Sequence, residues 1–365
     1  MSWLYRRVAR PLLFLQDAES AHNRTLAALA LASRWRPALS FTRSLYRPAE
    51  LPVRCLGLSF PNPVGLAAGM DKKGIALPLW EALGFGFSEL GGITWHAQPG
   101  NPPPRMFRIA AEEALINRMG FNNAGAPALA QRLEDWRRRH LWPPHPVGIN
   151  LGKSKITPLD AAAADYADSF AALRTLADFF VVNVSSPNTP NLRRLQDRAA
   201  LDEILAALQS RNVADTSAPR RPVLVKVAPD LTPDALDEVV DVALARGVAG
   251  LVATNTTTER PATADPGLAA RYRETGGLSG RPLRQRSTEV VRHLYRQSQG
   301  RLALVAVGGI SSPADAWEKV IAGANLLQLY SALVFQGPDL AGTIVDGLRE
   351  RLAGGRWEDA VGSAN

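Results

Sequence analysis

The chain has 365 residues, of which 46% are hydrophobic and 21% charged, proportions ordinary for a soluble globular protein with one large domain and an appendage. Its formal net charge of +8 suits nucleic acid, acidic ligands or an anionic membrane surface, but no helix-turn-helix or finger pattern accompanies it, so nucleic acid is the least expected partner. The single cysteine, Cys55, excludes an intramolecular disulfide and a cysteine-ligated iron–sulfur cluster, and the scattered histidines lack metal-ligand spacing, so no metal site is predicted.

Residues 1–48 are predicted to form a helical arm ahead of a main domain at 49–365. Apolar residues recur at helical spacing at the start of the chain, with arginines among them, and Pro11 is expected to bend or restart this helix. A second helix is predicted from about Ala18 to Leu31, and prolines at 37 and 48 then punctuate the way into the main domain.

A secretory signal and a membrane-spanning helix both explain the arm poorly, because Asp17, Glu19, His22 and Arg24 interrupt its apolar run. Two short helices that are apolar on one side and basic on the other are typical of an interfacial membrane anchor. The same pattern also suits two helices that simply pack on the main domain, and the arm alone does not separate these interpretations.

From residue 60 onward, short apolar runs alternate with longer amphipathic segments, which predicts parallel strands joined by crossover helices. Eight such units over this length predict a (β/α)₈ TIM barrel. A doubly wound open sheet is the alternative, but it would need a G-x-G-x-x-G fingerprint, which GLAAGMDKKG (65–74) is not. The candidate strands are Val64–Ala67, Phe87–Gly91, Val147–Leu151, Phe179–Val184, Val223–Val227, Gly250–Ala253, Leu304–Val307 and Leu326–Leu329.

Polar residues and glycines follow the predicted strands where each one ends, and in a barrel these ends share one rim. The clearest case is FFVVNVSSPNTP (179–190), where an apolar strand ends in amides and hydroxyls around Ser186. Lys226 lies inside an apolar strand, where an ammonium is costly unless it meets an anion. Gly308-Gly309 and Tyr330-Ser331 follow the last two strands, where barrels commonly hold a phosphate.

These residues resemble the dihydroorotate dehydrogenase family over nearly the whole chain. The motifs that carry the resemblance are GLAAGMDK (65–72), QPGNPPPRMFR (98–108), INRMGFNN (116–123), GINLGKSK (148–155), VVNVSSPNTP (181–190), VKVAPDLT (225–232), ATNTT (253–257), GGLSGRPL (276–283), VGGI (307–310) and QLYSALVF (328–335). The helical arm and a serine, rather than a cysteine, at the catalytic position are similar to the quinone-linked class 2 branch.

The resemblance implies an FMN enzyme of pyrimidine biosynthesis that oxidises dihydroorotate to orotate and passes two electrons to a quinone. It implies that Ser186 is the base that removes the C5 proton while C6 delivers hydride to the flavin. The residues matching the family's cofactor positions are Ala68, Gly69, Met70, Asp71, Lys72, Gly92, Asn150, Asn183, Lys226, Thr254, Gly280, Gly309, Tyr330 and Ser331. The residues matching its substrate positions are Lys72, Asn117, Arg118, Met119, Gly120, Phe121, Asn183, Asn188, Asn255 and Thr256.

One position departs from the family pattern, since Gly92 stands where the motif usually has threonine, and a side-chain contact to the flavin is expected to be missing there. Two rival functions remain: another FMN barrel that oxidises a different cyclic amide, and a membrane-peripheral protein that binds a phosphorylated ligand without turnover. Among the rival substrates, dihydroorotate is favoured because it carries a carboxylate. Lys72 and the loop at 117–121 offer that carboxylate a cation and amides.

The resemblance also gives the arm a purpose, because quinones partition into the bilayer and need an apolar entrance. We expect peripheral attachment to the cytoplasmic side of a cell membrane, with no protein partner implied and with Arg6, Arg7 and Arg10 meeting anionic head groups. His22 and Arg108 are polar candidates for the quinone head. The residues expected to line the entrance are Trp3, Leu4, Leu12, Leu13, Phe14 and Leu15.

Overall fold

The computed structural model describes residues 2–214, 216 and 219–365. Eight parallel strands close into a barrel in the order β10-β12-β13-β3-β4-β7-β8-β9, which confirms the (β/α)₈ barrel and excludes the open sheet. The strands are β3 (Val64–Leu66), β4 (Phe87–Ile93), β7 (Val147–Leu151), β8 (Phe179–Asn183), β9 (Val223–Val227), β10 (Gly250–Ala253), β12 (Ala303–Val307) and β13 (Leu326–Leu329). Each predicted strand coincides with one of these to within two residues at either end, because short, buried, mainly apolar runs bounded by glycine or polar residues mark parallel strands clearly.

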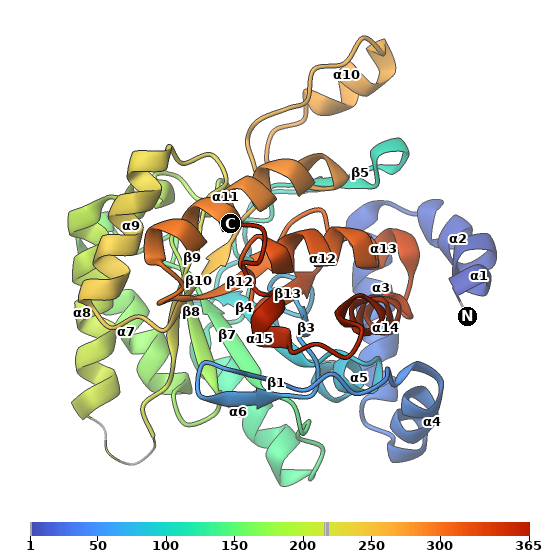
Figure 1. The fold of residues 1–365 in the computed structure, drawn as a ribbon, viewed down its shortest axis with the longest axis horizontal. Helices are drawn as coiled ribbons and strands as arrows, with labels where there is room; N and C mark the ends of the chain where they lie inside the picture. Colours follow the sequence, from blue (N-terminus) through green and yellow to red (C-terminus); the bar gives the residue numbers. More distant parts are fainter. Residues whose placement is uncertain (1, 215, 217–218) are drawn as a thin grey trace.

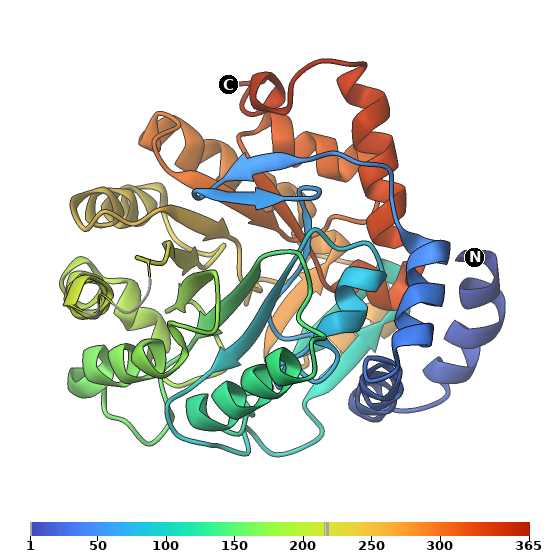
Figure 2. The ribbon, with the colours of Figure 1, turned by 90° about the horizontal axis from the view of Figure 1, so that it is seen from below.

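Helices surround the barrel, as the end-on view in Figure 2 shows. They are α5 (Leu77–Ala82), α6 (Ala126–Arg138), α7 (Ala162–Leu173), α8 (Arg198–Ala214), α9 (Pro233–Ala245), α11 (Arg284–Ser298), α12 (Pro313–Ile321), α13 (Ser331–Gln336), α14 (Leu340–Leu352) and α15 (Trp357–Ala360). Short 3₁₀ turns lie at Ala110–Glu112, Leu159–Ala161, Leu192–Gln196 and Arg281–Leu283.

Two insertions at the carboxyl ends of the strands build a small second sheet. The segment after β4 contributes β5 (Met106–Ile109) and β6 (Ala114–Asn117), and the segment after β10 contributes α10 (Pro266–Tyr272) and β11 (Gly277–Gly280). The strands pair antiparallel in the order β11-β6-β5, and α10 projects beyond this sheet in Figure 1. The opposite end of the barrel carries the hairpin of β1 (Val53–Cys55) and β2 (Leu58–Phe60).

The arm consists of α1 (Ser2–Leu4), a π-helical turn at Tyr5–Ala9, α2 (Arg10–Phe14), α3 (Ala18–Ala32) and α4 (Arg36–Tyr46). The π-helical turn immediately precedes the helix that contains Pro11, in line with the expected restart. Helix α4 was not predicted, because its proline was interpreted as a break, yet Pro37 lies in the first turn, where a missing N–H costs nothing.

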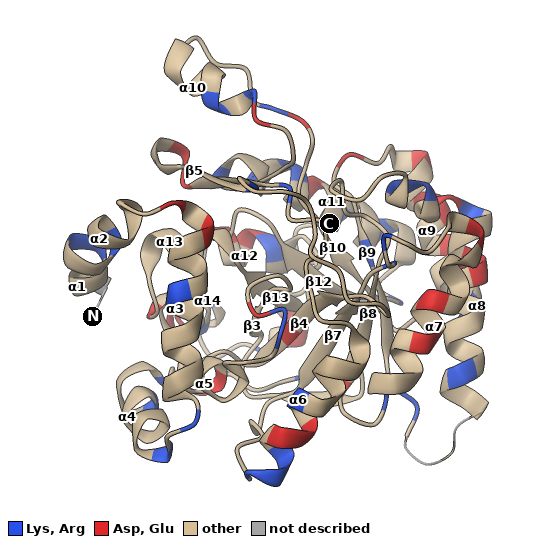
Figure 3. Ribbon diagram, turned by 180° about the vertical axis from the view of Figure 1, so that it is seen from behind, with Lys and Arg blue, Asp and Glu red and all other residues tan. Residues whose placement is uncertain are grey.

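The arm packs against the barrel on its inner side. Tyr5 Oη donates to the Val334 carbonyl at 2.7 Å, Arg43 forms an ion pair of 2.6 Å with Glu81, and Arg105 forms one of 2.7 Å with Glu19. Its outer side exposes large apolar residues, which are Trp3, Leu4, Val8, Leu12, Leu15, Leu31, Trp35, Phe41 and Leu45. Figure 3 marks Lys and Arg on α2 and α4 among them. Across the described ranges, no helix is both long and apolar enough to cross a bilayer.

The amino-terminal end of the barrel is filled by aromatic rings. Phe87 and Phe179 meet edge to face with their centroids 6.1 Å apart, and Phe60 of β2 contacts Phe87 in the same way at 5.4 Å. All three side chains are almost fully buried. The hairpin therefore closes the end of the barrel that lies opposite the polar strand ends.

We expect Phe179→Ala to lower the free energy of unfolding by about 3–5 kcal/mol, because it opens a cavity among rings that cannot collapse to fill it. Phe41→Ala, on an exposed ring of α4, should change stability by less than about 0.5 kcal/mol. Chemical denaturation of both full-length variants measures the difference, and equal midpoints would contradict this view of the barrel floor.

Candidate active site

One cavity lies at the carboxyl ends of the barrel strands and brings together most of the predicted site residues. The predicted residues that line it are Ala68, Gly69, Lys72, Gly92, Asn117, Met119, Gly120, Phe121, Asn183, Ser186, Asn188, Lys226, Thr254, Asn255, Thr256, Gly280, Gly309, Tyr330 and Ser331. They come from the ends of seven of the eight barrel strands, all but β7, or from the loops and insertions that follow them, as convergence on one rim requires.

A chain of amides crosses the floor of this cavity. The Asn183 side chain donates to Asn150 Oδ1 at 2.8 Å and accepts from Asn255 Nδ2 at 3.1 Å. At the wall, Asn188 Nδ2 donates to Asn117 Oδ1 at 3.2 Å. Each amide is thereby fixed in orientation by its neighbour, which leaves the remaining donors and acceptors available for a ligand rich in amide groups.

A buried carboxylate stands behind these amides. Glu89, at the centre of β4, is fully buried and accepts from Asn150 Nδ2 at 2.7 Å and from Gln328 Nε2. Lys226 of β9 stands beside Asn183 in the strand register and lines the cavity. Burial lowers the pKa of Lys226, and the negative charge of Glu89 opposes that shift. The barrel interior thus contains both signs of charge close to the site.

Ser186 lies on the loop that follows β8, and it is 6% exposed. Its Oγ accepts a hydrogen bond from the Asn188 backbone N–H at 3.3 Å. The loop is tied down by Arg193, which donates to the Ser185 carbonyl at 3.2 Å and to the Thr256 carbonyl at 3.1 Å.

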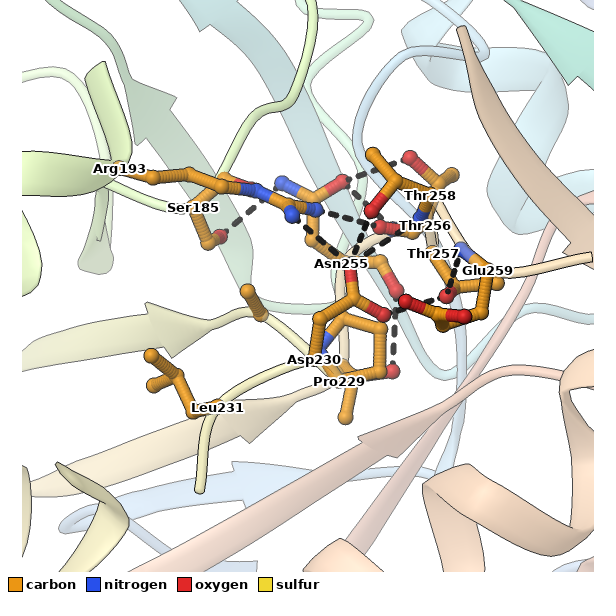
Figure 4. A network of polar contacts seen from close by, with 12 residues as sticks. Ser185, Arg193, Pro229, Asp230, Leu231, Asn255, Thr256, Thr257, Thr258 and Glu259 are labelled. Atoms are coloured by element: carbon orange, nitrogen blue, oxygen red, sulfur yellow. Dashed lines mark hydrogen bonds and ion pairs between the residues drawn. The ribbon is translucent and has the colours of Figure 1, made fainter. Parts of the chain in front are cut away.

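Arg193 also pairs with Asp230 at 2.7 Å, and the network in Figure 4 joins the loops after β8, β9 and β10. Asp230 in turn accepts from the hydroxyls of Thr257 and Thr258. A serine on a loop anchored at this many points is held in a defined position at the cavity wall.

Lys72 provides a cation at the other side of the cavity. Its Nζ donates to Asn122 Oδ1, and the side chain is half-buried between the barrel and the arm. Burial and the charge of Arg105 lower the pKa of Lys72 to about 7, while Glu19 opposes the shift. The ammonium is therefore only partly populated at neutral pH until an anion joins it.

The far end of the cavity is formed by the turn at Gly308-Gly309 and by Ser331. Gly309 has φ +69°, and a Cβ on it would lie 2.5 Å from the Cα of Arg284, so another residue would be strained there. Ser331 Oγ lies 2.8 Å from Ser279 Oγ of β11. A glycine turn and two hydroxyls therefore lie together at this end, and backbone N–H groups and hydroxyls are the donors that suit a phosphate.

Four of the predicted site residues do not line this cavity. Asn150 lies one hydrogen bond behind Asn183, and Met70 lines a second cavity described below. The Asp71 carboxylate turns inward to the N–H groups of Ile75 and Ala76 and to Trp80 Nε1. Arg118 pairs with Glu274 at 2.8 Å and stacks on Phe107. Their contacts to a ligand stay predictions.

The glycine at position 92 has a local explanation. A Cβ on Gly92 would lie 2.6 Å from the ring of Phe121, which lines the same cavity. With the ring in this position, a threonine would collide with it, so Phe121 fills the space that a side chain at position 92 would need.

A second, apolar cavity lies between the arm and the barrel. Leu13, Phe14 and His22 of the arm line it, together with Arg108 of β5 and Tyr330. Tyr330 also lines the first cavity, so its ring is shared between the two. Trp3, Leu4, Leu12 and Leu15, which were expected at this entrance, are exposed on the outer side of the arm.

The polar groups of the second cavity are few. Burial and the positive charge of Lys72 lower the pKa of His22 to about 4, so its imidazole is neutral at pH 7. Arg108 donates to the Leu13 carbonyl at 3.2 Å, and its guanidinium lies 4.4 Å from the centre of the Phe14 ring. Burial raises the pKa of Tyr330 to about 12, so the phenol keeps its proton.

Sequence reasoning missed several residues at the first cavity. Gln328, Ser279 and Glu113 line it, and Glu89 supports it from behind. The buried polar residues Gln328 and Glu89 sit inside apolar strands, in QLY and SELGG, and that signal marks an internal functional cluster. No comparable pattern marks Ser279 and Glu113, because they reach the site only through the small second sheet.

The fold and these cavities define a (β/α)₈ barrel enzyme with an amide-rich cavity, lined also by Lys72 and Lys226, at the carboxyl ends of its strands. The family model described as dihydroorotate dehydrogenase matches residues 50–352. A protein of Gloeobacter violaceus named dihydroorotate dehydrogenase (quinone) is 53% identical over 348 residues, covering 95% of this chain and 94% of the relative. A protein of the same name from Salinispora arenicola is 53% identical over 92% of this chain and 96% of its own length.

Among solved structures, DHODH from Eimeria tenella in complex with ferulenol matches with a TM-score of 0.86 and 38% identity, over 95% of each chain. The chain belongs to the dihydroorotate dehydrogenase family.

Proposed function

We propose that this protein oxidises dihydroorotate to orotate in pyrimidine biosynthesis, with FMN in the first cavity and a membrane quinone in the second. The observation that carries the proposal is that an amide-rich barrel cavity containing Ser186 shares the ring of Tyr330 with an apolar cavity beneath the arm. A polar substrate and an apolar electron acceptor therefore have separate sites on either side of one wall. The names of the relatives support the same activity.

The first cavity fits a flavin mononucleotide. Gln328 Oε1 is buried without a hydrogen-bond partner among the described residues, which leaves an acceptor for a donor such as an amide N–H. Bound FMN would supply the two-electron chemistry that links oxidation of dihydroorotate to reduction of the quinone. The residues we propose to hold it are Ala68, Gly69, Met70, Asp71, Lys72, Gly92, Asn150, Asn183, Lys226, Thr254, Gly280, Gly309, Tyr330 and Ser331.

The substrate carries a carboxylate and a ring of amides, and the remaining cavity groups match these in kind. Lys72 offers a cation to the carboxylate, while the side chains of Asn117, Asn188 and Asn255 offer donors and acceptors to the ring. Arg118, Met119, Gly120, Phe121, Asn183 and Thr256 complete the proposed set. A dihydropyrimidine without the carboxylate would leave Lys72 uncompensated, so the site favours dihydroorotate over the rival cyclic amides.

Ser186 is the proposed base. Its Oγ takes the C5 proton of dihydroorotate while its own hydroxyl proton passes to a water molecule. The electron pair of the C5–H bond then forms the C5=C6 double bond as the C6 hydrogen leaves as hydride. The Asn188 N–H that donates to this Oγ stabilises the negative charge that develops as the serine proton leaves. Burial of the loop excludes bulk water from the reacting atoms.

The arm is the proposed membrane attachment and quinone entrance. Its outer side combines exposed apolar residues such as Trp3 and Trp35 with basic residues, which is the composition of an interfacial anchor on an anionic surface. Its inner side lines the second cavity, so an apolar molecule can pass from the bilayer to Tyr330 without crossing water. We place the protein on the cytoplasmic side of the cell membrane.

We expect Ser186→Ala to retain bound flavin but to slow its reduction by dihydroorotate by a factor of about 10² or more, because general-base catalysis contributes that much. Stopped-flow bleaching of the flavin absorbance measures the rate, with Ser210→Ala, on the exposed side of α8 and outside the cavity, as the control. Reduction at the wild-type rate would refute the assignment of the base.

We expect orotate binding to weaken as pH rises above about 7. The pKa of Lys72 is about 7 in the free site, so above that pH the ammonium loses its proton and binding the carboxylate must restore it. Affinity should fall by at most about tenfold per pH unit. Titrations followed by flavin absorbance test this, and Lys72→Met should flatten the profile whereas its exposed neighbour Lys73→Met should not. An unchanged profile in Lys72→Met would assign the titration to another group.

We expect Ala21→Phe to slow reoxidation by a long-chain quinone by about tenfold or more while sparing flavin reduction by dihydroorotate. Ala21 is buried in α3 and lines the second cavity, so a phenyl ring would occupy quinone space. Ala27→Phe, on the exposed side of the same helix, is the matched control. Rapid kinetics of the two half-reactions separates the effects, and equal loss in both would mean that the substitution disturbs the whole enzyme.

A further inference from the structure

A buried lysine lies behind the turn at Gly308-Gly309. Lys319 of α12 is 0% exposed. Its Nζ donates to the Arg284 carbonyl at 2.7 Å and to the hydroxyls of Ser287 and Thr288 at 2.6 Å each. All three acceptors belong to α11 and are neutral oxygens. They therefore solvate the ammonium without cancelling its charge.

The same residues of α11 hold the turn. Ser287 Oγ, which accepts from Lys319, donates to the Gly308 carbonyl at 2.9 Å. Gly309 is pressed against Arg284, since a Cβ on it would lie 2.5 Å from the Arg284 Cα. One hydroxyl therefore separates the ammonium from a turn whose residues line the first cavity.

The charged side chains that pack under the turn pair with one another, whereas Arg281, which also lines the cavity, donates to the Ala111 carbonyl at 2.8 Å. Arg284 pairs with Asp315 at 2.7 Å, and Asp315 also accepts from the Ser311 N–H. Glu318 approaches Arg284 at 3.9 Å rather than Lys319. Among the described residues, Nζ of Lys319 has no carboxylate within hydrogen-bonding distance. A buried cation of this kind is costly unless an anion lies nearby, and the cavity side of the turn is open to one.

We infer that Lys319 is a positioning residue that holds the turn through Ser287, and that its positive charge stabilises a phosphate group bound at Gly308-Gly309. This inference rests on the proposed function, in which that phosphate belongs to FMN. It predicts that Lys319 contributes to the affinity for FMN but not to the affinity for riboflavin, which has the same ring system and no phosphate.

The charge of Lys319 also predicts a pH dependence. Burial lowers the pKa of Lys319 to about 7, with Glu318 and Asp315 opposing the shift and Arg284 and Arg292 adding to it. A phosphate, whose second pKa is about 6, is a dianion above pH 7 and favours the ammonium. As pH rises, more Lys319 is deprotonated in the free protein, and binding of FMN must return a proton to it. The preference for FMN over riboflavin should therefore decline between pH 7 and 9.

The experiment titrates flavin-free, full-length protein with FMN and with riboflavin and follows quenching of flavin fluorescence at pH 7 and pH 9. We expect Lys319→Met to reduce the FMN-over-riboflavin affinity ratio at pH 7 by about tenfold or more and to remove its decline with pH. Lys155→Met, which removes one exposed lysine charge, should behave as wild type. Ser287→Ala, which removes the linking hydroxyl, should lower the same ratio even if Lys319→Met fails to fold.

An unchanged ratio in Lys319→Met or Ser287→Ala would overturn the inference. A lowered ratio in Lys319→Met together with a wild-type ratio that does not vary between pH 7 and pH 9 would support the role of the charge, because Met keeps the length of the side chain, and would overturn only the predicted titration of Lys319 in this range. Wild-type protein that binds neither flavin would instead overturn the proposed function, so the two failures are distinguishable.

Discussion

Closure of the parallel barrel is the constraint on which the rest of the structure depends. Every strand of the parallel barrel ends at the same rim. Amides and hydroxyls that are far apart in the sequence therefore become neighbours in the structure. The interior of the barrel is apolar at the end closed by Phe87 and Phe179 and polar at the end where Asn183, Lys226 and Glu89 meet. Asn183 and Glu89 are both hydrogen-bonded to Asn150 on neighbouring strands, and the negative charge of Glu89 favours the ammonium of Lys226, which stabilises this buried polar cluster.

The sequence predicted the barrel and its rim well because both depend on local patterns. Buried strands such as Val147–Leu151 and Val223–Val227 show as short, mainly apolar runs rich in Val and Ile, and their polar residues, Asn150 and Lys226, lie near the end of each run. Helix α4 was missed because proline was taken as a stop signal, although Pro37 occupies a helical first turn.

Long-range features escaped prediction for a different reason. The small sheet pairs Asn117 with Gly277, more than 150 residues away, and strands this short carry no periodicity that reveals a distant partner. The Lys319 contacts are equally invisible, since a lysine at the end of an amphipathic helix looks like an exposed charge. The second cavity depends on where the arm docks, and its helical periodicity fixes an apolar side but not the surface that side meets.

The arm has both of the faces that its sequence pattern predicts. Its inner side is bound to the barrel by hydrogen bonds and ion pairs such as Arg43–Glu81, while its outer side leaves apolar residues in solvent. A neutral His22 and a protonated Tyr330 keep the cavity between arm and barrel free of formal charge at these two positions. An apolar ring with polar carbonyl groups is compatible with such surroundings.

The small sheet has an evolutionary consequence. Its three strands come from two insertions, one after β4 and one after β10, and β6 is hydrogen-bonded on both edges. Asn117 and Gly280, at the two ends of that pairing, both line the active-site cavity. A lengthened or shortened loop in one insertion would shift the register of the other and move site residues with it, so the two segments are bound to diverge together rather than separately.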